Sequence, residues 1–321
     1  MQKSKFVKFL KVVLPLLLGV FLIIYSYNKF TPEQLAEIKS HFAHARYEYV
    51  ALSIFFAVLS HLSRAWRWLY QLEPMGYRPK FANSLMAVLV TYLVNLAVPR
   101  GGEISRALVL DKYENIPFEK GFGTIIAERI ADLVILIVLI FTAFFLQFDT
   151  LYGFLAEKVS PTKAIWTLLI LGIIGLGFLF WVFNSKSGLG NKIKIFVLGV
   201  KEGVISIVHM KNKWSFIAHT LFIWIMYIMM FYISVYVLPE TSEISFGVVI
   251  TAFVVGSMTV AFTNGGFGTY PFLVAEILVL FHIPETVGTA FGWIVWTSQT
   301  VLVIVSGSLA FLFLPILNRQ K

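Results

Sequence analysis

Two short polar interruptions inside apolar segments carry the residue types best suited to hold a charged group. The first reads Pro99-Arg100-Gly101-Gly102-Glu103 and is followed by Arg106. The glycines free the backbone just before a helix expected to begin near Glu103, so open amides and a positive helix terminus would face the gap. Arg100 and Arg106 add permanent cations whose planar forks fit phosphate. The pattern favours an anionic headgroup.

The same residues also allow a purely structural interpretation. Glu103 lies three positions before Arg106, and on a helix two such residues can pair. In that case the ion pair only closes the turn.

A second charged cluster, Glu128-Arg129-Ile130-Ala131-Asp132, opens another apolar segment. Glu128 and Asp132 share a helix face, and Arg129 can pair with Asp132. Because each charge costs roughly 2.5–3.5 kcal/mol at the centre of a membrane helix, the cluster is expensive there. It either binds a headgroup or takes up a proton, or it neutralises itself as a structural triad.

The second interruption reads Asn264-Gly265-Gly266-Phe267-Gly268, and Glu276 follows it. No lysine or arginine occurs from 214 to 318, so Glu276 has no evident cationic partner in the sequence. A carboxyl in such a setting predicts proton coupling.

The composition shows what must position these residues. Hydrophobic residues make up 58% of the 321 and charged residues 13%, against about 45–50% and about 25% in soluble domains. A soluble catalytic domain is therefore excluded within this length. The absence of cysteine excludes disulfides and thiolate metal sites, and we predict no metal and no cofactor.

The hydropathy pattern predicts an all-α polytopic membrane protein. The first apolar run follows several lysines but lacks a small-residue cleavage site, so we expect it to remain as a span. The apolar runs lie at about 12–27, 47–63, 83–98, 124–148, 164–183, 214–238, 245–263, 270–282 and 287–315.

The distribution of basic residues sets the expected orientation. Lysine and arginine concentrate before the first run, in 64–82, in 184–213 and at the C-terminus, which should be cytoplasmic. This holds if each interruption returns to the side it came from, which gives about six full spans, two re-entrant hairpins and cytoplasmic termini. If each hairpin instead crossed the membrane fully with both of its segments, the two termini would still be cytoplasmic.

A weak internal repeat links the interruptions. A shift of 164 residues places Gly101-Gly102 on Gly265-Gly266 within repeat units of about 83–148 and 247–315. Because the units begin on opposite sides, this predicts an inverted repeat with a substrate site at its interface, inside a single transmembrane domain, 1–321. The alternative is that two unrelated turns both use glycine for close packing.

Three further segments are expected at membrane surfaces. Thr31-Pro32-Glu33-Gln34 predicts a capped helix lying on the outer face, where the His41 and His44 spacing suits an interfacial polar face better than a metal site. Residues 184–213 predict a basic amphipathic segment on anionic inner-leaflet headgroups. The stretch from Arg64 to Trp68 predicts an interfacial anchor, and no segment favours nucleic acid.

The chain resembles the family of the lysylphosphatidylglycerol synthase transmembrane region over roughly 10–315. The resemblance rests on Gly102-Glu103-x-x-Arg106, Glu128-Arg129-x-x-Asp132 and the turn from Asn264 to Gly268. It implies a bacterial inner-membrane protein similar to the flippase half of the multiple peptide resistance factor. By that resemblance the two charged motifs form the headgroup site, and the turn is their counterpart from the outer side. Because no soluble domain follows the membrane region here, we expect no lysyl transfer.

Three functions are compatible with these residues. The favoured one is a flippase for an anionic or aminoacylated phospholipid or a lipid-linked precursor. An integral-membrane transferase could instead use Glu128 or Asp132 as general base on a lipid-linked substrate. A noncatalytic scaffold would recruit lipid-synthesising enzymes as partners.

Overall fold

The computed structural model describes residues 2–98, 100–150 and 210–319, together with six isolated residues between 153 and 207. They belong to two compact units: Met1–Ile125 with Lys211–Lys321, called the main unit here, and Ile126–Met210, called the smaller unit. Every longer element of the described part is a helix. The helices are α1 (Gln2–Lys29), α2 (Pro32–His44), α3 (Tyr47–Leu72), α4 (Phe81–Ala97), α5 (Gly101–Glu114), α6 (Phe118–Leu146), α10 (Lys213–Ser234), α11 (Phe246–Phe262), α12 (Thr269–Leu280) and α13 (Glu285–Leu317).

Four of these helices are long and apolar enough to cross a membrane: α3, α6, α10 and α13, the first and third with a short added turn. A fifth candidate is α1 together with α2, which meet at a bend of 114°. The described part therefore belongs to an all-helical, multi-pass membrane protein with four or five candidate spans. The span predicted at 164–183 lies outside the described residues, as does most of the basic segment predicted at 184–213.

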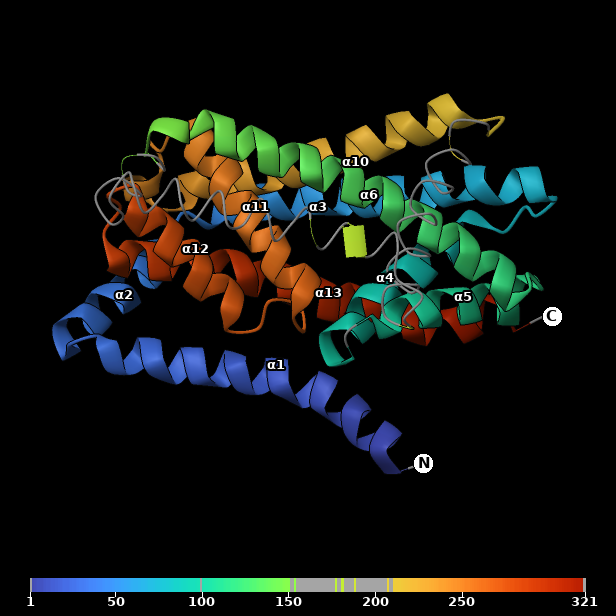
Figure 1. The fold of residues 1–321 in the computed structure, drawn as a ribbon, viewed down its shortest axis with the longest axis horizontal. Helices are drawn as coiled ribbons and strands as arrows, with labels where there is room; N and C mark the ends of the chain where they lie inside the picture. Colours follow the sequence, from blue (N-terminus) through green and yellow to red (C-terminus); the bar gives the residue numbers. More distant parts are fainter. Residues whose placement is uncertain are drawn as a thin grey trace. The chain divides into compact units, whose positions relative to one another are not determined.

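The helix predicted after Thr31 is confirmed as α2. The Gln34 amide donates to Thr31 Oγ1 at 3.3 Å, and the Thr31 amide donates to Gln34 Oε1 at 2.9 Å, with Pro32 in the first helical position. Figure 1 shows α1 beside the rest of the main unit and joined to it through α2.

The helix α13 runs along much of the main unit. Its 33 residues make a rod about 50 Å long at 1.5 Å per residue. α12 lies antiparallel along the first half of α13, with Gly292 against Pro271 and Gly288 against Ala275. These two glycines, four residues apart, allow the backbones to approach closely, as in many membrane helix pairs.

α4 lies antiparallel along the second half of α13. Gly307 of α13 lies against Leu93 of α4. Near the end of α13, Asn318 and Asn83 exchange amide hydrogen bonds of 2.8 and 3.0 Å. Asn83 also donates to Glu114 at the end of α5, so α5 ends where α4 begins. α4 and α5 thus run out from one end of α13 and back.

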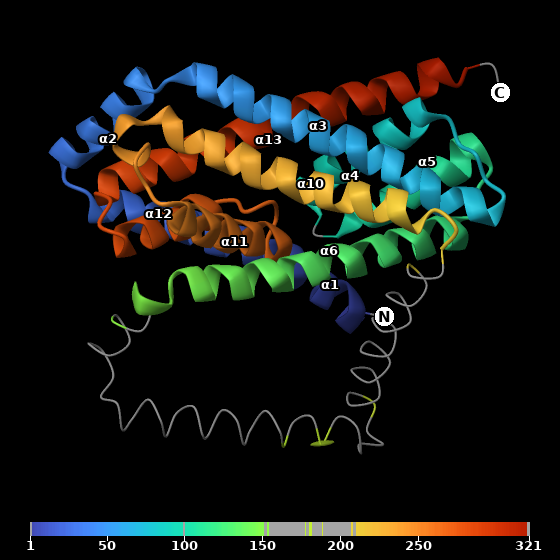
Figure 2. The same cartoon turned by 90° about the horizontal axis from the view of Figure 1, so that it is seen from above.

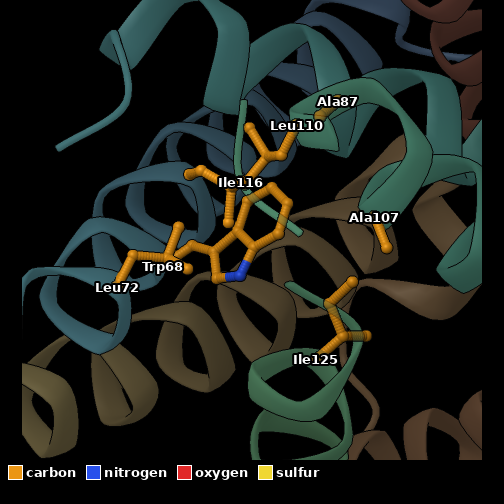
Figure 3. Packing of buried hydrophobic residues seen from close by; sticks show 7 residues of the cluster. All are labelled: Trp68, Leu72, Ala87, Ala107, Leu110, Ile116 and Ile125. Atoms are coloured by element: carbon orange, nitrogen blue, oxygen red, sulfur yellow. The ribbon is translucent and has the colours of Figure 1, made fainter. Parts of the chain in front are cut away.

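The remaining helices support these two pairs. Figure 2 shows α3 and α10 running side by side, in agreement with their close packing. Trp68 of α3 lies within an apolar cluster to which α4 and α5 also contribute, and Figure 3 shows its indole ring among these side chains. The cluster consists of Trp68, Leu72, Ala87, Ala107, Leu110, Ile116 and Ile125. It holds α5 against α3 and α4.

Candidate functional site

Two helix pairs of the main unit are interrupted, and the interruptions lie against one another. The first separates α4 from α5, and the second separates α11 from α12. A side chain at Gly265 in the second would collide with Leu96 at the end of α4. Trp296, the twelfth of the 33 residues of α13, donates its Nε1 proton to the Gly265 carbonyl at 2.8 Å. Irregular backbone from both pairs therefore meets about halfway along α13.

The first interruption uses its leading amides within the protein. The Gly101 amide donates to the Val98 carbonyl at 2.9 Å, and the Gly102 amide donates to Asn95 Oδ1 at 2.8 Å. The expectation that the glycines leave amides open for an anion is therefore wrong at both positions. Gly102 is buried, and a Cβ there would collide with the Thr91 carbonyl. These glycines allow close packing.

Arg100 supplies the charge at the tip of the first interruption. Its side chain is exposed, and it makes no hydrogen bond or ion pair with any residue in the described part of the chain. Its backbone is left-handed, with φ of 60°. That conformation costs a non-glycine residue roughly 1–2 kcal/mol, so the fold holds Arg100 there at some expense. Glu103, one turn later, is half-buried.

The second interruption is a run of left-handed glycines. Gly265, Gly266 and Gly268 have φ values of 62°, 77° and 67°. The Gly266 amide donates to Thr263 Oγ1 at 3.0 Å, which caps it much as Asn95 caps the first interruption. Gly268 lies directly against the backbone of Gly19 in α1.

Asn264 sits at the start of this turn, with 2% of its surface exposed. Neither its Nδ2 nor its Oδ1 has a hydrogen-bond partner among the described residues. A buried polar group without a partner costs about 1–3 kcal/mol. A carboxamide can both donate to and accept from a ligand. A ligand bound at Asn264 would therefore supply hydrogen-bond partners for both of its side-chain polar atoms.

Arg106 points into the protein. Only 1% of its surface is exposed, and its guanidinium carbon lies 3.7 Å from the centre of the Trp68 ring. Trp68 Nε1 in turn donates to Thr124 Oγ1 at 2.8 Å. The predicted headgroup cation therefore lies over an aromatic ring, in a geometry that favours a positive charge.

Two arginines of α3, Arg64 and Arg67, are buried, although the sequence predicts them at the membrane surface. Arg67 donates to Thr220 Oγ1 at 2.9 Å, and Arg64 donates to the Tyr227 hydroxyl at 3.4 Å. The Tyr227 hydroxyl lies 3.0 Å from that of Tyr92, one turn before the first interruption. The expected interfacial anchor from Arg64 to Trp68 is therefore wrong, since Trp66 alone among these five is exposed.

The sequence did contain a signal for these arginines. Ser60, Arg64, Arg67 and Gln71 follow at spacings of four, three and four residues, which places them on one face of α3. A polar stripe on an apolar helix faces the protein interior, and arginine inside a membrane helix is a functional-site hypothesis by default.

In the smaller unit, the charged motif of α6 is compact. Arg129 Nη1 lies 3.7 Å from Asp132 Oδ2, which confirms the predicted pairing. Glu128 and Asp132 are buried.

Glu276 does have a cationic partner, which corrects the expectation from its sequence neighbours. Lys29 Nζ, at the end of α1, lies 3.9 Å from Glu276 Oε1 and forms a hydrogen bond with Glu285. The side chain of Glu276 is 42% exposed. In the described ranges, no group of three or more histidine, cysteine or acidic residues could hold a metal.

Comparison with known proteins gives a family match over most of the chain. A family model described as the lysylphosphatidylglycerol synthase TM region matches residues 12–307. No solved structure matches.

Curated relatives match shorter stretches. One UPF0104 membrane protein of Methanocaldococcus jannaschii is 34% identical over 110 residues, which are 33% of this chain and 32% of that protein. Another from the same organism is 30% identical over 113 residues, 35% of this chain and 47% of that protein. The glycosyltransferase AglD of Haloferax volcanii is 34% identical over 86 residues, 26% of this chain and 14% of that protein. Each match thus spans less than half of the relative's length.

Proposed function

This chain belongs to the family of the lysylphosphatidylglycerol synthase transmembrane region, and from that premise we propose that it is a lipid flippase. Its substrate is an anionic or aminoacylated phospholipid, or a lipid-linked precursor, carried between the two leaflets. The headgroup passes through the protein, and the acyl chains stay in the bilayer.

The observation that carries this proposal is the meeting of the two interruptions beside the middle of α13. Since α13 is long enough to cross the bilayer, its middle corresponds to the membrane interior. Irregular backbone is tolerated at that depth only where it is buried in protein or lines a wet cavity. Two such segments in contact favour an internal polar path.

In this proposal the two interrupted pairs are re-entrant hairpins of an inverted repeat. Gly102 and Gly266, which the 164-residue shift aligns, both donate their amides to a side-chain oxygen. In addition, a Cβ added at Gly121 of α6 would lie 3.8 Å from Ala107 of α5, and one at Gly288 of α13 would lie 3.3 Å from Ala275 of α12. Matching contacts at corresponding places support a common ancestry of the pairs.

The headgroup route combines cations with adaptable polar groups. Arg100 meets the phosphate at the tip of the first hairpin, and Asn264 binds it from the second. The Tyr92, Tyr227 and Arg64 chain extends the route toward the end where α4 begins. Buried cations lower the cost of taking an anionic headgroup out of water. By the family resemblance, headgroup binding is also assigned to Glu103 and, in the smaller unit, to Glu128, Arg129 and Asp132.

The distribution of basic residues supports a cytoplasmic location for both termini. The bacterial inner membrane is proposed from the family resemblance alone. Proteins that synthesise or modify the transported lipid are then its natural partners.

The test is lipid translocation in proteoliposomes loaded with a fluorescent phosphatidylglycerol, with bleaching from outside. Wild-type protein should expose the inner-leaflet probe faster than empty vesicles. Arg100→Gln and Arg64→Gln should slow this exposure, whereas Arg78→Gln, on a side chain 83% exposed, should not. Equal rates for wild type and empty vesicles across anionic, aminoacylated and lipid-linked sugar probes would remove the flippase proposal.

Proton coupling at Glu276 is a separate prediction. Glu276→Gln should abolish any pH dependence of translocation if its carboxyl carries the proton, because the amide does not titrate. An unchanged pH profile in this variant would exclude that role.

The second candidate is an integral-membrane transferase acting on a lipid-linked substrate, with Glu128 or Asp132 as general base. It is favoured by the matched stretch in the glycosyltransferase of Haloferax volcanii. Turnover of a polyprenyl-phosphate sugar by the purified protein, lost in Asp132→Asn, would support it over transport.

A further inference from the structure

A cavity of about 290 Å³ lies between α1, α2, α12 and α13, all in the main unit. Most of its lining is apolar, including Leu22, Ile38, Phe42, Phe272 and Trp293. Its volume is at the lower end of the range of ligand pockets, roughly 300–1,000 Å³. A narrow apolar cavity of this kind fits a single hydrocarbon chain.

Charged side chains occur at one place on this mainly apolar lining. Glu276 and Glu285 both line the cavity, and Lys29 is bonded to Glu285. Lys29 Nζ is 3.9 Å from Glu276 Oε1, too far for a hydrogen bond. An ammonium has three donors, so Lys29 keeps donors for another acceptor while Glu276 keeps lone pairs for another donor. The group presents one positive and two negative charges.

We propose that this cavity binds one acyl chain of a zwitterionic phospholipid whose headgroup carries a phosphate and a primary ammonium. The ammonium binds Glu276, the phosphate accepts from Lys29, and the chain fills the apolar lining. Three alternatives fit less well. An anionic phospholipid has no cationic group to pair with Glu276. A fatty acid would place a third carboxylate beside two, and a quaternary ammonium has no proton to donate.

The exposure of α1 allows a lipid to reach this site from the bilayer. Leu14, Leu17, Phe21 and Ile24 are exposed along α1. At Gly19 the helix contacts Gly268, next to the second interruption. A lipid held between α1 and α12 therefore fixes α1 against that turn. This site does not include Arg100, Asn264 or Arg64 of the proposed headgroup route, and lipid binding here does not require transport or the proton coupling predicted for Glu276.

The experiment measures binding, without transport. Delipidated protein in detergent is titrated with phosphatidylethanolamine, phosphatidylcholine and phosphatidylglycerol of identical chains, and bound lipid is counted by native mass spectrometry. We expect one tightly bound phosphatidylethanolamine, with the other two at least tenfold weaker. Equal affinity for all three lipids overturns the proposal.

Two variants and one control locate the site. Glu276→Gln should weaken phosphatidylethanolamine binding about tenfold and reduce its preference over phosphatidylcholine, and Leu22→Trp should fill the cavity and remove the bound lipid. Glu33→Gln, an exposed acid of α2 outside the lining, should bind as wild type. Melting curves without lipid verify that each variant is folded. Unchanged binding in folded Glu276→Gln and Leu22→Trp also overturns the proposal.

Discussion

Two asparagines flank the meeting point of the interrupted pairs, and their surroundings differ. Asn95 accepts the Gly102 amide proton, so it stabilises the local backbone. Asn264 is more deeply buried than Asn95, which is half-buried, and the Asn264 side chain forms no hydrogen bond with any of the described residues. A side chain kept at a cost to folding at such a place is more readily explained by ligand binding than by packing.

We expect Asn264→Leu to keep or raise stability and to slow translocation. Leucine removes a buried unsatisfied amide that costs about 1–3 kcal/mol, but it also removes a hydrogen bond to the headgroup, worth roughly tenfold in rate. Asn95→Leu is the matched comparison and should lower the melting temperature, because it leaves the Gly102 amide without its acceptor. Both quantities can be measured on one preparation by thermal unfolding and by the proteoliposome assay. A stability loss in Asn264→Leu as large as that in Asn95→Leu would contradict this assignment.

Gly102 provides a prediction about close packing. Gly102→Ala places a methyl group against the Thr91 carbonyl and within 2.8 Å of Asn95, so we expect a loss of about 1–3 kcal/mol. Gly123→Ala, at a helical position with open space, should be neutral or stabilising by up to about 1 kcal/mol. Thermal unfolding of the two variants decides the matter. Equal melting temperatures would mean that α4 and α5 do not approach each other this closely at Gly102.

At the scale of residues, the sequence predicted contacts between neighbours along the chain well and contacts between residues distant in sequence poorly. The Arg129 and Asp132 pair follows from helical spacing alone. Lys29 and Glu285 are 256 residues apart, so no local pattern could have joined them or brought Lys29 to Glu276. The buried arginines of α3 are predictable from their polar stripe, but the tryptophans beside them in the sequence favour a membrane surface.

At the scale of elements, Gly288 and Gly292 of α13 determine how closely the backbones of α12 and α13 approach. A Cβ at Gly292 would lie 2.7 Å from the Pro271 carbonyl oxygen, whereas one at Gly288 would lie 3.3 Å from Ala275. Backbone cannot yield as a flexible side chain can, so the closer contact carries the larger penalty.

We therefore expect Gly292→Ala to cost about 1–3 kcal/mol and Gly288→Ala clearly less. The order of the two melting temperatures tests this. A reversed order would mean that α12 lies differently on α13. Translocation should also fall in Gly292→Ala, because α12 carries the second interruption.

Some element boundaries followed closely from hydropathy, whereas α3 continues to Leu72, beyond the predicted end at 63. The run predicted at 287–315 is α13, Glu285–Leu317, and that at 245–263 is α11, Phe246–Phe262. Long apolar runs ended by glycine or charge define helices reliably, because both signals act locally. How α4 and α12 pack along α13 could not be read in this way, since packing depends on side chains distant in sequence.

At the scale of the whole molecule, the proposed topology can be tested directly, because the chain has no cysteine. Arg78 and Glu243 are both exposed. Arg78 lies in the connection 64–82, predicted to be cytoplasmic, and Glu243 lies in the connection 239–246, whose lack of lysine and arginine predicts the outer side. In intact cells, a membrane-impermeant maleimide should label Glu243→Cys and should label Arg78→Cys only after the membrane is opened. The opposite pattern would invert the proposed orientation.

The packing of the two interrupted pairs along different halves of α13 has a mechanical consequence. α12 lies along its first half and α4 along its second. A rigid beam that tilts about its midpoint carries its two arms in opposite directions. If α13 tilts in this way, one half of it moves away from the pair that it contacts while the other half moves toward its own pair. The two interrupted pairs would then move apart from α13 alternately, and never both at the same time.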